Sequence, residues 1–231
     1  NQDSFALVEN KEHALMGIVC DGIGGGNGGD VASKMAVTHM KDCFEKAFLC
    51  DKSDVEMKRW IMERIQEAND LVFTQASHQL DLHGMGTTMV GVIVCKDVAY
   101  VFNVGDSRTY GLYKDDFICL TEDHSYVADL LKKGEVSEEE ARNHPNRNVL
   151  TNAIGIWNKI RIDVNKIKND YKALLVCSDG LHGYVSEQMI RHVLESDFSV
   201  EEKVNLLVQA SLDAGGFDNV SVLVIEREET L

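Results

Sequence analysis

Three apolar segments of this 231-residue chain each run into an aspartate, and no other feature constrains the fold as strongly. The three combinations are residues 17–20 with Asp21, residues 101–105 with Asp106, and residues 174–178 with Asp179. Short apolar runs rich in Val, Ile and Leu are typical of buried β-strands. Asp218 stands just before a further run of this kind at residues 220–225.

An aspartate at the end of a buried strand costs free energy unless its charge is compensated. If several such strand ends converge, their carboxylates repel one another and need cations between them. Mg²⁺ and Mn²⁺ prefer oxygen ligands of this kind, and Gly22 and Gly180 would let the backbone turn sharply beside them. A single Asp-Gly is more often a turn, so only the repetition favours a metal site.

The remaining pattern predicts an α+β fold in which sheets lie between helices. Six segments have the composition of strands: residues 15–20, 87–95, 98–104, 109–113, 173–177 and 220–225. Two helices follow the first strand, one with a four-residue apolar repeat from Ala32 to Phe44 after a proposed N-cap at Asp30, the other with a similar repeat from Met57 to Val72. Capping boxes begin at Ser137 and Ser199.

No repeat, linker or low-complexity segment divides the chain, so we expect one domain over residues 1–231. Its composition also excludes several function classes. Lys and Arg number 23 against 38 Asp and Glu, a formal net charge of −15, which disfavours nucleic acid and anionic membrane surfaces as partners. No apolar run approaches the roughly 20 residues that span a bilayer, and residues 1–5 lack a signal-peptide pattern.

Six cysteines occur without any C-x-x-C pair, and a chain of this length does not depend on disulfides. We therefore expect free thiols and a reducing, cytoplasmic compartment. A monomer is the expectation.

The glycine-rich run at residues 22–29 admits a second interpretation. Gly24, Gly26 and Gly29 have the spacing of a dinucleotide-binding fingerprint between a strand and a helix. However, Asp21 would place negative charge beside a pyrophosphate, and two helices instead of one precede the next strand. We disfavour nucleotide binding on these grounds.

Taken together, the motifs resemble the metal-dependent protein phosphatases of type 2C, in their bacterial form. In chain order these motifs are Asn1-Gln2-Asp3, Asp21-Gly22-Ile23-Gly24-Gly25, Gly84-Met85-Gly86-Thr87-Thr88, Gly105-Asp106-Ser107-Arg108, Ser178-Asp179-Gly180 and Asp218-Asn219. The resemblance implies a four-layer α-β-β-α sandwich, with two central antiparallel sheets flanked by helix pairs. It implies hydrolysis of phosphoserine and phosphothreonine in proteins by a metal-activated water.

The resemblance also implies the site residues. Asp21 would bridge two Mn²⁺ or Mg²⁺ ions, and Asp179 and Asp218 would complete the first ion's ligands. The Gly22 carbonyl would help to hold the second ion, with Asp3 close by. Asp21, Asp179 and Asp218 are therefore the residues expected to be essential for catalysis.

Asp106 would pair with Asp179 at a third, weaker metal site, and residues 122–147 would form a mobile flap. Several positions depart from the family pattern. Gln2 replaces a common Glu, Ile23 replaces a histidine proposed as the general acid of eukaryotic relatives, and Gly183 replaces an Asp near the third metal.

The implied partners are phosphorylated proteins, including a bacterial Ser/Thr kinase and its targets. A pseudophosphatase that binds partners without turnover is the alternative function. The presence of Asp21, Asp179 and Asp218 favours the enzyme.

Overall fold

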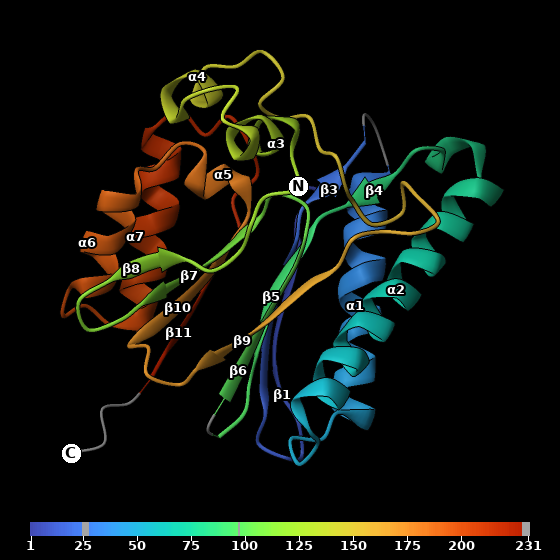
Figure 1. The fold of residues 1–231 in the computed structure, drawn as a ribbon, viewed down its shortest axis with the longest axis horizontal. Coiled ribbons are helices and arrows are strands. Elements are labelled where there is room, and N and C mark those ends of the chain that lie inside the picture. Colours follow the sequence, from blue (N-terminus) through green and yellow to red (C-terminus); the bar gives the residue numbers. More distant parts are fainter. Residues whose placement is uncertain (25–27, 97, 228–231) are drawn as a thin grey trace.

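The computed structural model describes residues 1–24, 28–96 and 98–227 and contains two antiparallel sheets packed face to face (Figure 1). The first sheet has, in spatial order, β1 (Ser4–Glu9), β2 (Leu15–Cys20), β5 (Met89–Val94), β6 (Val98–Val104) and β9 (Asp163–Lys168). The second has β11 (Val222–Glu226), β10 (Ala173–Cys177), β7 (Arg108–Leu112) and β8 (Phe117–Cys119). A two-stranded ribbon joins β3 (Gly22–Ile23) and β4 (Gly86–Thr87).

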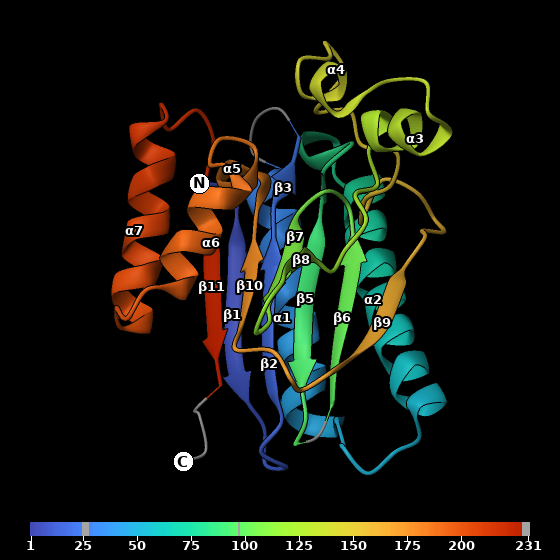
Figure 2. The same cartoon turned by 60° about the vertical axis from the view of Figure 1, so that its left-hand side comes forward.

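Helices cover the outer faces of both sheets (Figures 1 and 2). The first sheet is covered by α1 (Gly29–Ala47) and α2 (Asp54–His78), and the second by α6 (Glu187–Glu195) and α7 (Val200–Asp213). The shorter elements are η1 (Leu80–Leu82), α3 (Tyr126–Lys133), α4 (Glu138–Arg142) and α5 (Asp179–His182). The predicted four-layer α-β-β-α sandwich is confirmed.

Three hydrophobic clusters fill the three interfaces between these four layers. On β2, Ile18 faces the helix layer, whereas its neighbour Val19 faces the other sheet. On β10, Leu175 packs toward the second helix layer and Val176 toward the first sheet. Because side chains alternate along a strand, both faces of these strands are buried, and their sequences are continuously apolar.

The strands recognised from the sequence are all present, with ends shifted by up to two residues. The strand expected at residues 220–225, for example, is β11, which begins at Val222. Strands that alternate or are polar were not predicted, such as β1 and β9, whose side chains are largely exposed or half-buried. Edge strands of this kind carry no continuous apolar run.

The helix caps agree with the sequence in part. Ser137 and Ser199 form the predicted capping boxes with Glu140 and Glu202. The proposed N-cap at Asp30 is wrong: α1 begins at Gly29, and Asp30 lies inside its first turn, where a carboxylate stabilises the helix dipole.

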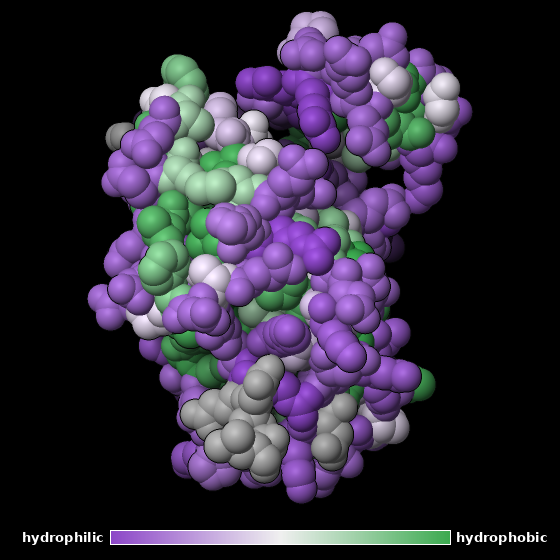
Figure 3. Space-filling view, turned by 90° about the vertical axis from the view of Figure 1, so that its left-hand side faces the viewer, coloured by the Kyte–Doolittle hydropathy of each residue, from purple (hydrophilic) through white to green (hydrophobic). Residues whose placement is uncertain are grey.

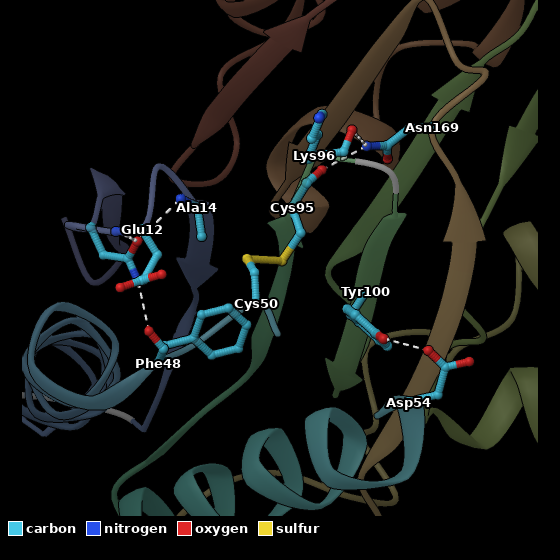
Figure 4. The surroundings of a disulfide bond; sticks show 10 residues. Glu12, Ala14, Phe48, Cys50, Asp54, Cys95, Lys96, Tyr100 and Asn169 are labelled. Carbon is cyan, nitrogen blue, oxygen red and sulfur yellow. Dashed lines mark hydrogen bonds between the residues drawn. A yellow bond between two sulfur atoms is a disulfide. The ribbon is translucent and has the colours of Figure 1, made fainter. Parts of the chain in front are cut away.

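The expectation of free thiols is wrong for two cysteines. Cys50, in the connection between α1 and α2, forms a disulfide with Cys95, which follows β5, and their Cα atoms lie 6.1 Å apart (Figure 4). The other four, Cys20, Cys43, Cys119 and Cys177, are free. The pair is separated by 45 residues, and only the fold brings its partners together.

The surface is consistent with the acidic composition. The face that includes α6 and α7 is mostly hydrophilic, with separate hydrophobic patches, and one lobe projects from its upper edge (Figure 3). Among the helices that the structure describes, none combines the length and the hydropathy that a bilayer crossing requires.

Candidate metal centre

The ends of β2 and β10 meet at one end of the two sheets. Asp21 follows β2 directly, and Asp179, the first residue of α5, is separated from the end of β10 by Ser178 alone. The N-terminus, β3 and α5 lie together at this end in both views (Figures 1 and 2). Two of the aspartates predicted to converge are therefore brought together by the packing of one sheet on the other.

Asp3 reaches the same place because β1 is paired with β2. The register sets Ser4 opposite Cys20, so the residues that flank this pair, Asp3 and Asp21, are neighbours. The Ser178 hydroxyl donates a hydrogen bond of 2.9 Å to Asp3 Oδ2. This bond ties the N-terminal segment to the second sheet.

Three carboxyl groups share this small volume. The carboxyl groups of Asp3 and Asp179 lie close enough to that of Asp21 for their charges to act on it. Burial, followed by the charges of Asp3 and Asp179, raises the pKa of Asp21 to about 10. Burial also raises the pKa of Asp3 and of Asp179. Without a cation, the cluster can therefore keep its charge low only by holding protons.

Two carboxylate oxygens of the cluster have no partner. Asp3 Oδ1 and Asp179 Oδ1 are buried and accept no hydrogen bond in the part of the chain that the structure describes. Buried acceptors without partners are rare and need an explanation. A divalent cation that takes oxygen ligands would satisfy both atoms and remove the repulsion, so these residues fit such an ion.

Gly22 brings backbone close to the carboxylates. A Cβ atom at this position would collide with the carbonyl groups of Gly29 and Gln2, and the Gly22 amide donates to the Gln2 carbonyl oxygen at 3.2 Å. The segment that begins α1 therefore packs directly on Gly22. Of the glycine-rich run, residues 25–27, including Gly26 of the dinucleotide fingerprint, lie outside the described residues.

Asp106 and Asp218 flank the cluster on two loops. Asp106 follows Gly105, whose φ of +110° favours glycine. Burial, then the charge of Asp179, raises the pKa of Asp106 to about 8. Asp218 is exposed, and its charge contributes to the raised pKa values of Asp3 and Asp179. All the predicted site residues thus lie in or beside one cluster.

Two supporting residues had not been given a role in the sequence analysis. The Thr88 hydroxyl accepts a hydrogen bond of 2.9 Å from the Asp21 amide, and Ser178 orients Asp3. Both residues belong to motifs that are recognisable in the sequence, but only the fold shows which side chains they contact.

His182, the last residue of α5, is not suited to act as an acid at neutral pH. Burial, then the charge of Arg108, lowers the pKa of His182 to about 4. Its Nε2 atom lies 2.9 Å from the Asp106 carbonyl oxygen. This contact orients the Asp106 loop.

Comparisons with known proteins agree with this fold. A sequence model described as protein phosphatase 2C matches residues 1–214. The serine/threonine phosphatase stp of Listeria welshimeri is 40% identical over 228 residues, which cover 98% of this chain and 90% of that protein. The chain belongs to the protein phosphatase 2C family.

Solved structures support the same assignment. The serine/threonine phosphatase Stp1 from Staphylococcus aureus superposes with a TM-score of 0.94 at 32% identity, covering 99% of this chain and 90% of that one. The catalytic domain of the phosphatase PstP, solved in complex with two manganese ions, gives a TM-score of 0.84 at 25% identity, covering 97% and 90%.

Proposed function

We propose that this protein is a metal-dependent phosphatase that hydrolyses phosphoserine and phosphothreonine in proteins. The observation that carries the proposal is the group of buried carboxylates around Asp21, in which Asp3 Oδ1 and Asp179 Oδ1 have no hydrogen-bond partner among the residues that the structure describes. Membership of the protein phosphatase 2C family supports this choice over other metal-dependent hydrolases.

Two Mn²⁺ or Mg²⁺ ions would be held by this group. Asp21 lies between Asp3 and Asp179 and is suited to bridge the ions, with Asp179 and Asp218 on one side. The Gly22 carbonyl and Asp3 would serve the other ion. Asp106, close to Asp179, would contribute to a third.

When bound, such ions activate water and neutralise negative charge on the phosphoryl oxygens. The side chains nearest the ions are carboxylates, which orient the site but offer no proton at neutral pH once metal has displaced it. Ile23 and His182 are not suited to supply one either, because the first has no ionisable group and the lowered pKa of His182 keeps its imidazole uncharged at neutral pH. The leaving alkoxide would therefore be protonated from solvent at the site.

The substrates would be phosphorylated proteins, including a Ser/Thr kinase and its targets. We treat residues 1–231 as a single catalytic domain that acts as a monomer. The segment over residues 122–147, which contains α3 and α4, would be the flap beside the site.

We also propose a cytoplasmic location. The four free thiols support it, whereas the Cys50–Cys95 disulfide points the other way. Cell fractionation, combined with alkylation of the protein in intact cells, tests the location and the disulfide together.

The test of activity is hydrolysis of a phosphothreonine peptide with Mn²⁺, compared with EDTA and with Asp179→Asn. We expect turnover with Mn²⁺ and loss of turnover in both other conditions. Turnover that persists in EDTA would refute metal dependence. Peptide binding without turnover by the Mn²⁺-loaded protein would indicate the pseudophosphatase instead.

A further inference from the structure

A histidine, a cysteine and a glutamate gather between α1 and α2, away from the carboxylate cluster. His39 and Cys43 are one turn apart on α1, and Glu67 faces them from α2. His39 lies 10 residues after Gly29, which corresponds to about 15 Å along the helix axis. The group is therefore separate from the proposed catalytic site.

The three side chains are held in place by the packing of the helix pair. Met40 and Phe44 of α1 are buried in the same hydrophobic cluster as Ile65 and Ala68 of α2. His39 and Cys43 flank this seam, since positions four residues apart share one side of a helix. Thus two ligand-type residues of one helix face a third across a packed interface.

The two distances from His39 Nε2 to the other ligand atoms match those around a tetrahedral metal ion. His39 Nε2 lies 3.6 Å from Cys43 Sγ and 3.3 Å from Glu67 Oε2. All three ligand atoms lie within 4.8 Å of one another. Zinc bonds of about 2.3 Å to sulfur and about 2.0 Å to nitrogen or oxygen separate sulfur from nitrogen by about 3.5 Å, and nitrogen from oxygen by about 3.3 Å.

A neighbouring arginine orients the carboxylate. Arg64 Nη2 forms an ion pair with Glu67 Oε1 at 2.8 Å, and the other oxygen, Oε2, lies 3.3 Å from His39 Nε2. Metal-ligating carboxylates in proteins are commonly fixed by an outer contact of this kind. The Glu67 side chain is 45% exposed, so water can reach a fourth ligand position.

We propose that His39, Cys43 and Glu67 bind Zn²⁺ through one imidazole, one thiolate and one carboxylate, with water as the fourth ligand. Thiolate and imidazole ligands select zinc over the Mg²⁺ and Mn²⁺ that suit an all-oxygen site. The ion would join α1 to α2 and stabilise the helix pair that covers the first sheet. A hydrogen-bonded trio without metal is the competing explanation.

Cobalt is the probe for this site, because Co²⁺ replaces Zn²⁺ and a thiolate ligand adds a ligand-to-metal charge-transfer band. The full chain is titrated with Co²⁺ as wild type, as Cys43→Ser and as the matched control Cys119→Ser, which changes another partly buried free thiol. We expect the band in the wild type and in Cys119→Ser, its loss in Cys43→Ser, and its displacement by Zn²⁺.

A second pair of variants keeps the zinc site testable if Cys43→Ser does not fold. Glu67→Gln should weaken Zn²⁺ binding at this site at least tenfold, whereas Glu63→Gln, which alters another carboxylate near Arg64, should not. A band of equal intensity in Cys43→Ser, or no band in the wild type at saturating Co²⁺, would overturn the proposal. If the wild-type protein shows the Co²⁺ charge-transfer band but has no phosphatase activity, the result counts against the proposed function and not against the zinc site.

Discussion

Asp123 and the carboxylate cluster around Asp21 lie near the same end of the sheets. They differ in how their negative charge is compensated. Asp123 is held by Arg108, whose Nε and Nη2 atoms donate bonds of 2.9 and 2.7 Å to its two oxygens. Asp21, in contrast, lies beside the carboxyl groups of Asp3 and Asp179, whose charges repel its own. The Arg108 guanidinium compensates the charge of Asp123, whereas the carboxyl groups around Asp21 repel one another.

The pKa values express this difference. Burial alone would lower the pKa of Arg108, but the hydrogen bond and the charge of Asp123 raise it above its usual range. Burial and repulsion raise the pKa of Asp21 to about 10. A self-contained ion pair stabilises the folded chain, whereas an uncompensated cluster destabilises it and is suited to bind an external cation.

The largest expected effect is on turnover. Asp21→Asn removes the central carboxylate, so we expect phosphatase activity with Mn²⁺ to fall by about 1000-fold or more, equivalent to about 4 kcal/mol. The variant should nevertheless be at least as stable as the wild type in EDTA, because the wild type must protonate Asp21 to fold at neutral pH, whereas Asn is neutral already. Steady-state kinetics and urea unfolding measure the two quantities; a large loss of metal-free stability would contradict the comparison.

Asp123→Asn should show the opposite pattern. It leaves the Arg108 guanidinium, 27% exposed, without its carboxylate, and breaking a buried pair costs about 3–5 kcal/mol. Because this pair is partly exposed, we expect a loss of about 2 kcal/mol in the free energy of unfolding, with the turnover of the folded enzyme changed less than tenfold. Equal stability to the wild type would show that the ion pair contributes nothing.

The metal-free protein should become less stable as the pH rises. Its folded state holds protons on Asp21 and Asp106, with pKa values near 10 and 8, which the unfolded chain loses near pH 4. The free energy of unfolding in EDTA should therefore fall between pH 5 and pH 8, by up to about 1.4 kcal/mol per pH unit for each carboxyl. Urea titrations at four pH values measure the slope, and Asp21→Asn should flatten it. A rise in stability over this range would contradict the raised pKa values.

The smallest effect concerns the hydroxyl that orients Asp3. Ser178→Ala removes a 2.9 Å hydrogen bond to Asp3 Oδ2, and loss of such an outer contact should weaken Mn²⁺ binding about tenfold. Calorimetric titration measures the affinity. Ser196→Ala, which removes a hydroxyl bonded only to a backbone carbonyl, is the control and should bind Mn²⁺ normally. Equal affinity in both variants would mean that Ser178 does not position the ligand.

Much of the site could be predicted because its signal is local. An apolar strand that ends in an aspartate is visible in the sequence, and it occurs at Asp21, Asp106 and Asp179. The convergence of these residues depends on β10 packing against the first sheet, and no spacing along the chain encodes that contact. The resemblance to a family supplied it.

Other features depended wholly on distant contacts. The Cys50–Cys95 disulfide and the approach of Glu67 to His39 join segments brought together only by the helix pair and its sheet. β1 and β9 were missed because their half-exposed side chains leave no continuous apolar run. Pairing with β2 and β6, more than their own composition, makes them strands.

The most direct test of the metal centre is anomalous X-ray scattering from crystals of the protein soaked in Mn²⁺. We predict anomalous peaks in contact with Asp21, between Asp3 and Asp179, and no such peaks in crystals of Asp21→Asn. A Mn²⁺-soaked wild-type crystal that diffracts well but shows no peak among these carboxylates would contradict the account.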